Sequence, residues 1–222
     1  MVEGQPKRAV MNTVVLKIII TVFIAATAVF SGVQAAPLAG LPDKLTPLAL
    51  HDGDNMLHIA PDTLPPNAQG ISAGTQIKVL RAWRDNGNAW GYHVYVTTAQ
   101  TPEGKHVLIG LEPPPNAHDT ALQDYVRDTP HTGEDSLAVI TFATANIDKK
   151  PALLLLECIR SPRGAVPTLG PAVLRIYKLV ASDGTPGWTP LYFKFMRDMP
   201  LKGEYDNAET AMQKEIGFTA SP

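Results

Sequence analysis

One segment, residues 81–93, concentrates side chains that suit the binding of a small organic anion. It holds two arginines, two tryptophans, a tyrosine and a histidine around Asn86-Gly87. A planar guanidinium pairs with a carboxylate through two hydrogen bonds, and rigid aromatic side chains pack a ligand at low entropic cost. A second interpretation is that the tryptophans belong to a sheet core and the segment is only a turn. The candidate ligand-binding residues are Arg81, Trp83, Arg84, Asp85, Asn86, Asn88, Trp90 and His93.

The sequence offers little for catalysis. The β-lactamase set of Ser-x-x-Lys, Ser-Asp-Asn and Lys-Thr-Gly is absent, and so is the zinc-protease motif His-Glu-x-x-His. His51 and His58 could bind a metal together with Asp52 or Asp54, but scattered surface histidines are the more common case. We therefore expect a protein that is not an enzyme and that has no catalytic residues, bound metal or cofactor.

Residues 1–35 are typical of a cleavable signal peptide. Basic residues precede an apolar stretch, which ends in small residues that suit signal peptidase. We expect cleavage after Ala35 and export of a β-rich domain, residues 36–222, to the periplasm. An uncleaved anchor is the alternative, although the apolar stretch is shorter than the roughly 20 residues of a spanning helix. Translation from Met1 and translation from Met11 both fit this pattern.

Charge and cysteine content restrict the partners of the exported domain. Residues 1–35 carry three basic residues and one acidic residue of a chain with net charge −2, so the remainder is mildly acidic. Nucleic acids attract basic surfaces, so nucleic-acid binding is not expected, and after signal cleavage no membrane span is expected. Cys158 is the single cysteine, which excludes an internal disulfide. A buried, unreactive thiol is favoured over a nucleophile or an intermolecular bridge.

Short alternating apolar runs separated by proline and glycine predict a mainly β fold, an antiparallel β-sandwich-like domain. The best-defined hairpin pairs residues 76–83 with 90–98 across Asn86-Gly87, because Asn-Gly is the strongest signal for a type I′ turn. The other strands expected are 45–50 paired with 56–60, 106–111, 137–144, and 172–181 paired with 191–196.

Three further segments affect the organisation of the domain. Residues 152–158 are apolar on both faces, as a central strand would be. Residues 119–127 are polar and could form one or two helical turns. One compact unit and two β subdomains divided near residues 113–133 are both compatible with the sequence.

The chain closes with one short helix. Asp206 as the N-cap, three residues before Glu209, forms a variant of the capping box, and Gly217 has the position of a C′ glycine. These signals predict a helix over residues 208–216 that packs on the sheet. Its buried stripe would consist of Ala208, Ala211, Met212 and Ile216.

Several of these segments resemble the CarG-like carbapenem intrinsic-resistance family of exported proteins. The resemblance begins with Arg84–Ala89, which an alternating strand follows. It continues in two late strands, 173–179 and 187–193, and in the closing segment Tyr205–Gly217. The chain departs from the family motifs where the family has an aromatic residue, a histidine and a cysteine; these positions hold Gly87, Trp90 and Asp206.

The resemblance implies a periplasmic, mainly antiparallel β protein that forms a homodimer and protects against a carbapenem without hydrolysing it. Sequestration of this β-lactam and protection of its targets are both open mechanisms, and a second envelope resistance protein is a candidate partner. Arg81 or Arg84 would pair with the carboxylate of the carbapenem, while Trp83 and Trp90 pack against its bicycle. The alternative function is a periplasmic β-sandwich module that binds another ligand or assembles with a partner protein.

Overall fold

The computed structural model of the chain describes residues 44–66, 68–88, 90–129 and 136–218. All of them belong to one compact unit, Gln34–Pro222. The predicted signal peptide and the two alternative start sites lie outside the described residues. Within the described residues, no helix is both long enough and apolar enough to cross a membrane.

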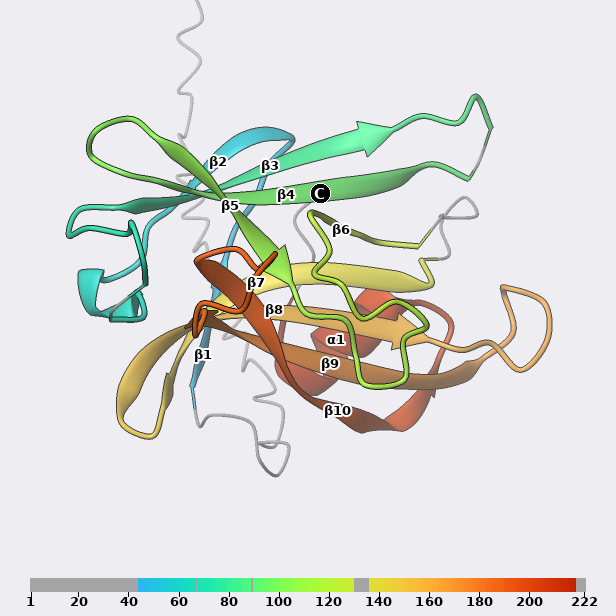
Figure 1. Cartoon of the computed structure of the whole chain (residues 1–222). Helices are drawn as coiled ribbons and strands as arrows, with labels where there is room; N and C mark the ends of the chain where they lie inside the picture. The colour runs from blue at the N-terminus through green and yellow to red at the C-terminus, as the bar shows by residue number, and fades with distance from the viewer. Residues whose placement is uncertain (1–43, 67, 89, 130–135, 219–222) are drawn as a thin grey trace, which may run out of the picture. The chain divides into compact units, whose positions relative to one another are not determined.

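The described residues are mainly β structure, as predicted, with one α-helix and one short 3₁₀ helix (Figure 1). Their strands form a single ten-stranded sheet in the order β1-β7-β8-β9-β10-β5-β4-β3-β2, and β6 pairs with β4. The elements are β1 (Leu45–Leu48), β2 (Gly53–Leu57), η1 (Pro61–Thr63), β3 (Gln76–Arg84), β4 (Tyr92–Gln100), β5 (His106–Leu111), β6 (Val126–Arg127), β7 (Ala138–Ile147), β8 (Lys150–Arg160), β9 (Gly170–Ala181), β10 (Leu191–Tyr205) and α1 (Ala208–Ile216).

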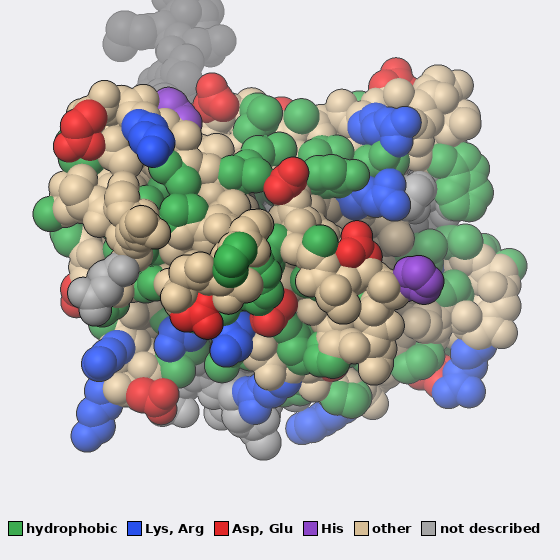
Figure 2. Space-filling view, in the orientation of Figure 1, with side chains coloured by type: hydrophobic (Ala, Val, Ile, Leu, Met, Phe, Trp, Pro, Cys, Tyr) green, Lys and Arg blue, Asp and Glu red, His purple; other side chains and the backbone are tan. Residues whose placement is uncertain are grey.

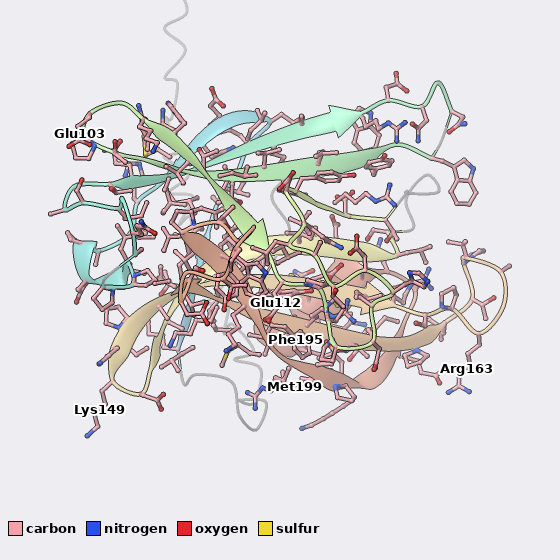
Figure 3. All side chains as sticks on the ribbon, in the orientation of Figure 1. Glu103, Glu112, Lys149, Arg163, Phe195 and Met199 are labelled. Atoms are coloured by element: carbon pink, nitrogen blue, oxygen red, sulfur yellow. The ribbon has the colours of Figure 1, made fainter. Side chains whose placement is uncertain are left out.

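The expectation of an antiparallel β-sandwich is wrong in its details. β10 pairs with β5 in parallel, with Leu191 opposite Ile109, and this pairing joins β2–β5 and β7–β10 into one mixed sheet. The physical reason is hydrogen bonding, because two separate sheets would leave the backbone groups of β5 and β10 unpaired at open edges. A side chain strengthens the join: the Glu112 carboxylate accepts a 2.8 Å hydrogen bond from the Phe195 N–H (Figure 3).

The sheet bends so that two of its parts face each other across a hydrophobic core. Figure 1 shows β3 and β4 above, β7–β9 below, and β5 descending between them. Ile77 and Val79 of β3 belong to the same buried cluster as Phe142 of β7 and Leu155 of β8. A second cluster lies on the opposite face of β7–β9, where Met212 of α1 is fully buried.

β8 separates the two clusters, which confirms the prediction of a central strand that is apolar on both faces. Its alternate leucines enter opposite clusters, Leu155 the first and Leu154 the second. Cys158 is fully buried in the second cluster, and burial raises the pKa of its thiol to about 12. The thiol is therefore neutral at physiological pH and lacks the thiolate character of a reactive cysteine.

Two predicted hairpins are confirmed, since β3 pairs with β4 and β9 pairs with β10. The predicted pairing of residues 45–50 with 56–60 is wrong, because β1 pairs with β7 and β2 pairs with β3. The turn itself forms: the buried Asn55 side chain accepts from the His51 N–H and donates to the His51 carbonyl, each at 2.8 Å. Long-range pairing then takes the two flanks of this turn to opposite edges of the sheet.

Helix α1 confirms the predicted helix, and Gly217 follows it with a left-handed φ of 72°. The N-cap is Asn207 rather than Asp206, because the Asn207 side chain accepts a 2.7 Å hydrogen bond from the Glu209 N–H. The buried residues of the helix are Ala208, Ala211 and Met212, and Ile216 is partly buried against the same cluster.

Residues 119–127 form none of the helical turns that their sequence allowed. Gln123 forms a β-bridge with Leu111, and Arg127 of β6 lies opposite Val94 of β4. Pairing with an existing strand satisfies the backbone groups of a polar segment that is too short to be stable as a helix by itself.

Candidate functional site

The predicted site residues lie on the β3–β4 hairpin and in its loop. In the register of this hairpin, Trp83 lies opposite His93 and Arg84 lies opposite Tyr92. Because successive side chains of a strand point to opposite faces, Arg81 and Trp83 share one face with His93, whereas Arg84 and Tyr92 share the other. The predicted residues therefore separate into an inner group, an outer group and a loop group.

The inner group consists of Arg81 and His93, which two carboxylates join. Arg81 Nη2 lies 3.1 Å from His93 Nε2, and Arg81 Nε lies 3.4 Å from an Asp52 carboxylate oxygen. Asp128 contacts the other side of the histidine, because it accepts the His93 backbone N–H at 2.7 Å and lies 3.2 Å from Nδ1. Arg81 is 6% exposed and Asp128 is 3% exposed, so these two side chains are buried, whereas the Asp52 side chain is 64% exposed.

These contacts hold the imidazole rather than present it to a substrate. A guanidinium can only donate, so Arg81 requires an unprotonated Nε2, and the ring hydrogen is then on Nδ1, facing Asp128. Arg81 thus occupies the nitrogen that a general base would use. The cleft that these residues and Tyr95 help to line measures about 40 Å³. Pockets for drug-sized ligands measure roughly 300–1,000 Å³, so the inner group has no room for one.

The loop group shapes the connection between β3 and β4. Asp85 accepts the Gly87 N–H at 2.7 Å, and Asn88 accepts the Trp90 N–H at 2.9 Å. The Asn86 side chain donates to the Trp90 carbonyl at 2.6 Å. Gly87 has a positive φ of 68° but Asn86 does not, so the predicted type I′ turn is wrong, and a longer loop connects β3 to β4. These three polar side chains therefore fix the loop, which leaves the cations and aromatic residues as the groups able to contact a ligand.

Trp83 and Trp90 are each 47% exposed, so neither is a core residue. The Trp83 ring packs edge-on against the His93 ring, with 4.8 Å between the centroids. It also lies directly over Gly91, which has no side chain to obstruct it. The absence of a side chain at Gly91 thus leaves room for the exposed Trp83 ring against the hairpin.

Replacing Gly91 with alanine is expected to displace the Trp83 ring, because the new Cβ would lie 1.9 Å from Trp83 Cζ2. Since the ring is half exposed, it can swing outward, and the stability loss is expected to be about 1 kcal/mol, at the low end for overpacking. Tryptophan emission in a protein whose Trp90 and Trp188 are phenylalanine would report the change as a red shift. Gly164→Ala is the control, because its Cβ would approach nothing closer than 3.6 Å. An unchanged Gly91→Ala spectrum would contradict this packing.

The outer group contains Arg84, Tyr92 and Arg127. Tyr92 belongs to the segment that the sequence singles out but was not a candidate residue, and no sequence pattern singles out Arg127. Both arginines donate through Nη1 to the Tyr92 phenol oxygen, Arg127 at 3.3 Å. Each guanidinium carbon lies 5.2 Å from the centroid of the Tyr92 ring, as in a cation–π contact. The hydrogen bond from Arg84 lowers the pKa of Tyr92, and Arg127 contributes, whereas burial raises the pKa of Tyr95 on the inner face.

Both arginines of the outer group are exposed, and neither forms an ion pair with a carboxylate among the described residues. Arg127 reaches this position only through the pairing of β6 with β4. A sequence signal for it does not exist, because the pairing joins segments that lie far apart along the chain.

Two other features that suggest chemistry do not form sites. Gly70–Gly74 reads Gly-Ile-Ser-Ala-Gly and matches Gly-x-Ser-x-Gly, the nucleophile elbow of serine hydrolases. That elbow is a sharp turn from a strand into a helix, whereas this segment leads through turns into β3. His51 and His58 are both exposed, and in the described part of the chain no three His, Cys, Asp or Glu residues are placed to hold a metal.

Comparisons with known proteins bear on the fold. No family model and no curated protein matches the sequence. The structure is similar to a solved structure, the crystal structure of CarG, with a TM-score of 0.54 and 18% sequence identity over 76% of this chain and 94% of that chain. At this identity the likeness shows the fold alone. The resemblance expected from the sequence is confirmed at that level, as a distant one.

Proposed function

We propose that this chain, whose fold is similar to that of CarG, is an exported protein that protects its host against a carbapenem without enzymatic turnover. The likeness of the fold is the observation that carries the proposal. The hairpin tip supports it, because Arg84 and Trp90 are both exposed there. Trp83 is exposed on the opposite face of β3, so it does not flank Arg84 as expected from the sequence. The proposed location is the periplasm, reached through the signal peptide of residues 1–35.

Of the two arginines considered for the carboxylate of the drug, Arg84 fits and Arg81 does not. Arg81 is 6% exposed and contacts both Asp52 and His93, so a ligand would have to displace existing partners inside a small cleft. Arg84 is exposed and has hydrogen-bond donors beyond the one that Tyr92 accepts. We therefore assign the carboxylate contact to Arg84.

The test measures the minimum inhibitory concentration of a simple carbapenem for a susceptible Gram-negative host that produces the full chain. We expect a rise for the carbapenem and none for a penicillin. The rise should disappear when residues 1–35 are removed, because the targets of the drug lie outside the cytoplasm. It should also fall in Arg84→Ala and persist in Arg163→Ala, which removes an exposed arginine elsewhere.

Absence of protection by a protein that is shown to be folded in the periplasm would contradict the proposal. A module for another ligand or partner would then be the better description. If protection is found, varying the amount of protein against the amount of carbapenem separates the two mechanisms. Sequestration requires at least one binding site for each drug molecule removed. Under target protection, the amount of protein needed does not scale with the amount of drug.

A further inference from the structure

The outer group places two positive charges side by side. Because the Nη1 atoms of Arg84 and Arg127 reach the same phenol oxygen of Tyr92, their guanidinium groups are neighbours. Each guanidinium has five N–H donors, and Tyr92 accepts one from each, so several donors of both groups face solvent. Neighbouring cations repel each other, and no carboxylate among the described residues pairs with either of them. An anion that binds both would remove this repulsion.

The sheet face beside these cations is apolar. Two cross-strand pairs, Ala82–Val94 and Leu80–Val96, follow along the same face of β3 and β4. None of these four side chains enters either buried cluster, and Leu80 is 42% exposed. Figure 2 shows basic side chains next to hydrophobic ones at the end of the molecule where β3 and β4 project. Positive charge and exposed apolar surface thus meet on one face.

We infer that Arg84, Arg127 and Tyr92 form a binding site for the carboxylate of a small amphipathic molecule, whose apolar body lies over Ala82 and Val94. This inference deepens the proposed function and rests on it only for the identity of the ligand. The fork of each guanidinium matches a planar carboxylate, which has one oxygen for each arginine. The apolar pairs supply the remaining contact area, and Tyr92 holds the two arginines in their positions.

The experiment follows the arginine Nε–H signals and the backbone amides of the full chain by NMR during titration with four probes. Hexanoate carries both the anion and the apolar body, acetate only the anion, and 1-hexanol only the body, while inorganic phosphate is a different oxyanion. We expect saturable shifts at Arg84, Arg127 and Val94 with hexanoate and weaker binding of acetate. 1-Hexanol and phosphate are expected to produce no saturable shift at these residues.

Variants separate the site from general charge effects. Arg84→Gln and Arg127→Gln are each expected to weaken hexanoate binding about tenfold or more, the effect of losing one charged hydrogen-bond partner. Arg127→Lys keeps the charge but lacks the fork, so it is expected to restore only part of the affinity. Arg163→Gln is the matched control, because it removes an exposed arginine (Figure 3) that pairs with Glu204 elsewhere on the surface.

Three outcomes would overturn the inference: no saturable shift at Arg84 and Arg127, equal binding of hexanoate and 1-hexanol, or binding of phosphate alone. These outcomes are independent of the resistance test. If hexanoate binds as expected and the host gains no protection, the proposed function fails and the carboxylate site stands. If Arg127→Gln loses hexanoate but protects the host fully, the assignment of this site to the protective ligand is wrong.

Discussion

Replacing Arg175 with methionine is expected to lower the free energy of unfolding at pH 7 by about 3 kcal/mol, near the low end for breaking a buried ion pair. Arg175 lies between two carboxylates, with Nη1 at 3.4 Å from Glu157 and Nε at 2.9 Å from Asp198. Glu157 is the costly partner, since its side chain is 15% exposed and would remain charged without a cation. Asp198 is more exposed and can regain water. Urea denaturation would measure the loss.

The loss in the free energy of unfolding caused by Arg175→Met should depend on pH. Burial raises the pKa of Glu157 above its ordinary value of 4.5, and Arg175 opposes that rise. A carboxyl whose pKa is higher in the folded state binds more protons there, so stability is lost as pH rises through the folded pKa. Without Arg175 the pKa of Glu157 rises further, and the variant should recover stability on acidification from pH 7 towards about pH 5 more than the wild type does.

Two further variants test this explanation. Glu157→Gln in the Arg175→Met protein should restore much of the lost stability and remove its pH dependence, because no buried charge then remains. Arg163→Met breaks the exposed pair with Glu204, and its effect should stay below about 1 kcal/mol. A deficit in Arg175→Met that is the same at pH 5 and pH 7 would show that lost packing, not the carboxylate, is its cause.

Replacing Asp128 with alanine is expected to lower the free energy of unfolding by about 2–3 kcal/mol, since it leaves two donors, the His93 backbone N–H and the ring Nδ1–H, without their acceptor. Its carboxylate accepts the His93 N–H and lies beside the His93 ring, with a side chain that is 5% exposed. Asp52 contacts the same network from a side chain that is 64% exposed. Asp52→Ala is therefore the matched control, with an expected loss of about 0.5 kcal/mol.

The effect of Asp128→Ala should extend to the outer face. Asp128 directly follows Arg127 and anchors β6 to the backbone of β4 at His93. Loss of this anchor should broaden or shift the NMR signals of Arg127 and weaken hexanoate binding, although Asp128 does not lie on that face. Equal stability losses in Asp128→Ala and Asp52→Ala would contradict the view that burial decides the strength of these contacts.

The sequence correctly predicted the elements whose signals lie in neighbouring residues. The β3–β4 hairpin follows from alternation and Asn86-Gly87, and helix α1 follows from its apolar spacing and Gly217. The pairing of Leu45–Leu48 was wrong because the Asp52-Gly53 turn is a local signal, whereas β1 finds its partner in β7 far along the chain. The N-cap was misplaced by one residue because Asp206 and Asn207 are both good caps, and only the hydrogen bond to Glu209 distinguishes them.

The sequence by itself determined that this chain is mainly β and that 81–93 forms a hairpin rich in arginine and tryptophan, because alternation with period two and turn residues are local signals. Only the tertiary structure decided which face is covered. The fold places Val139 and Thr141 of β7 beside Arg81, which is buried, while Arg84 stays exposed, and the pairing of β6 with β4 brings Arg127 beside Arg84. These contacts join distant segments, and short-range spacing carries no information about them.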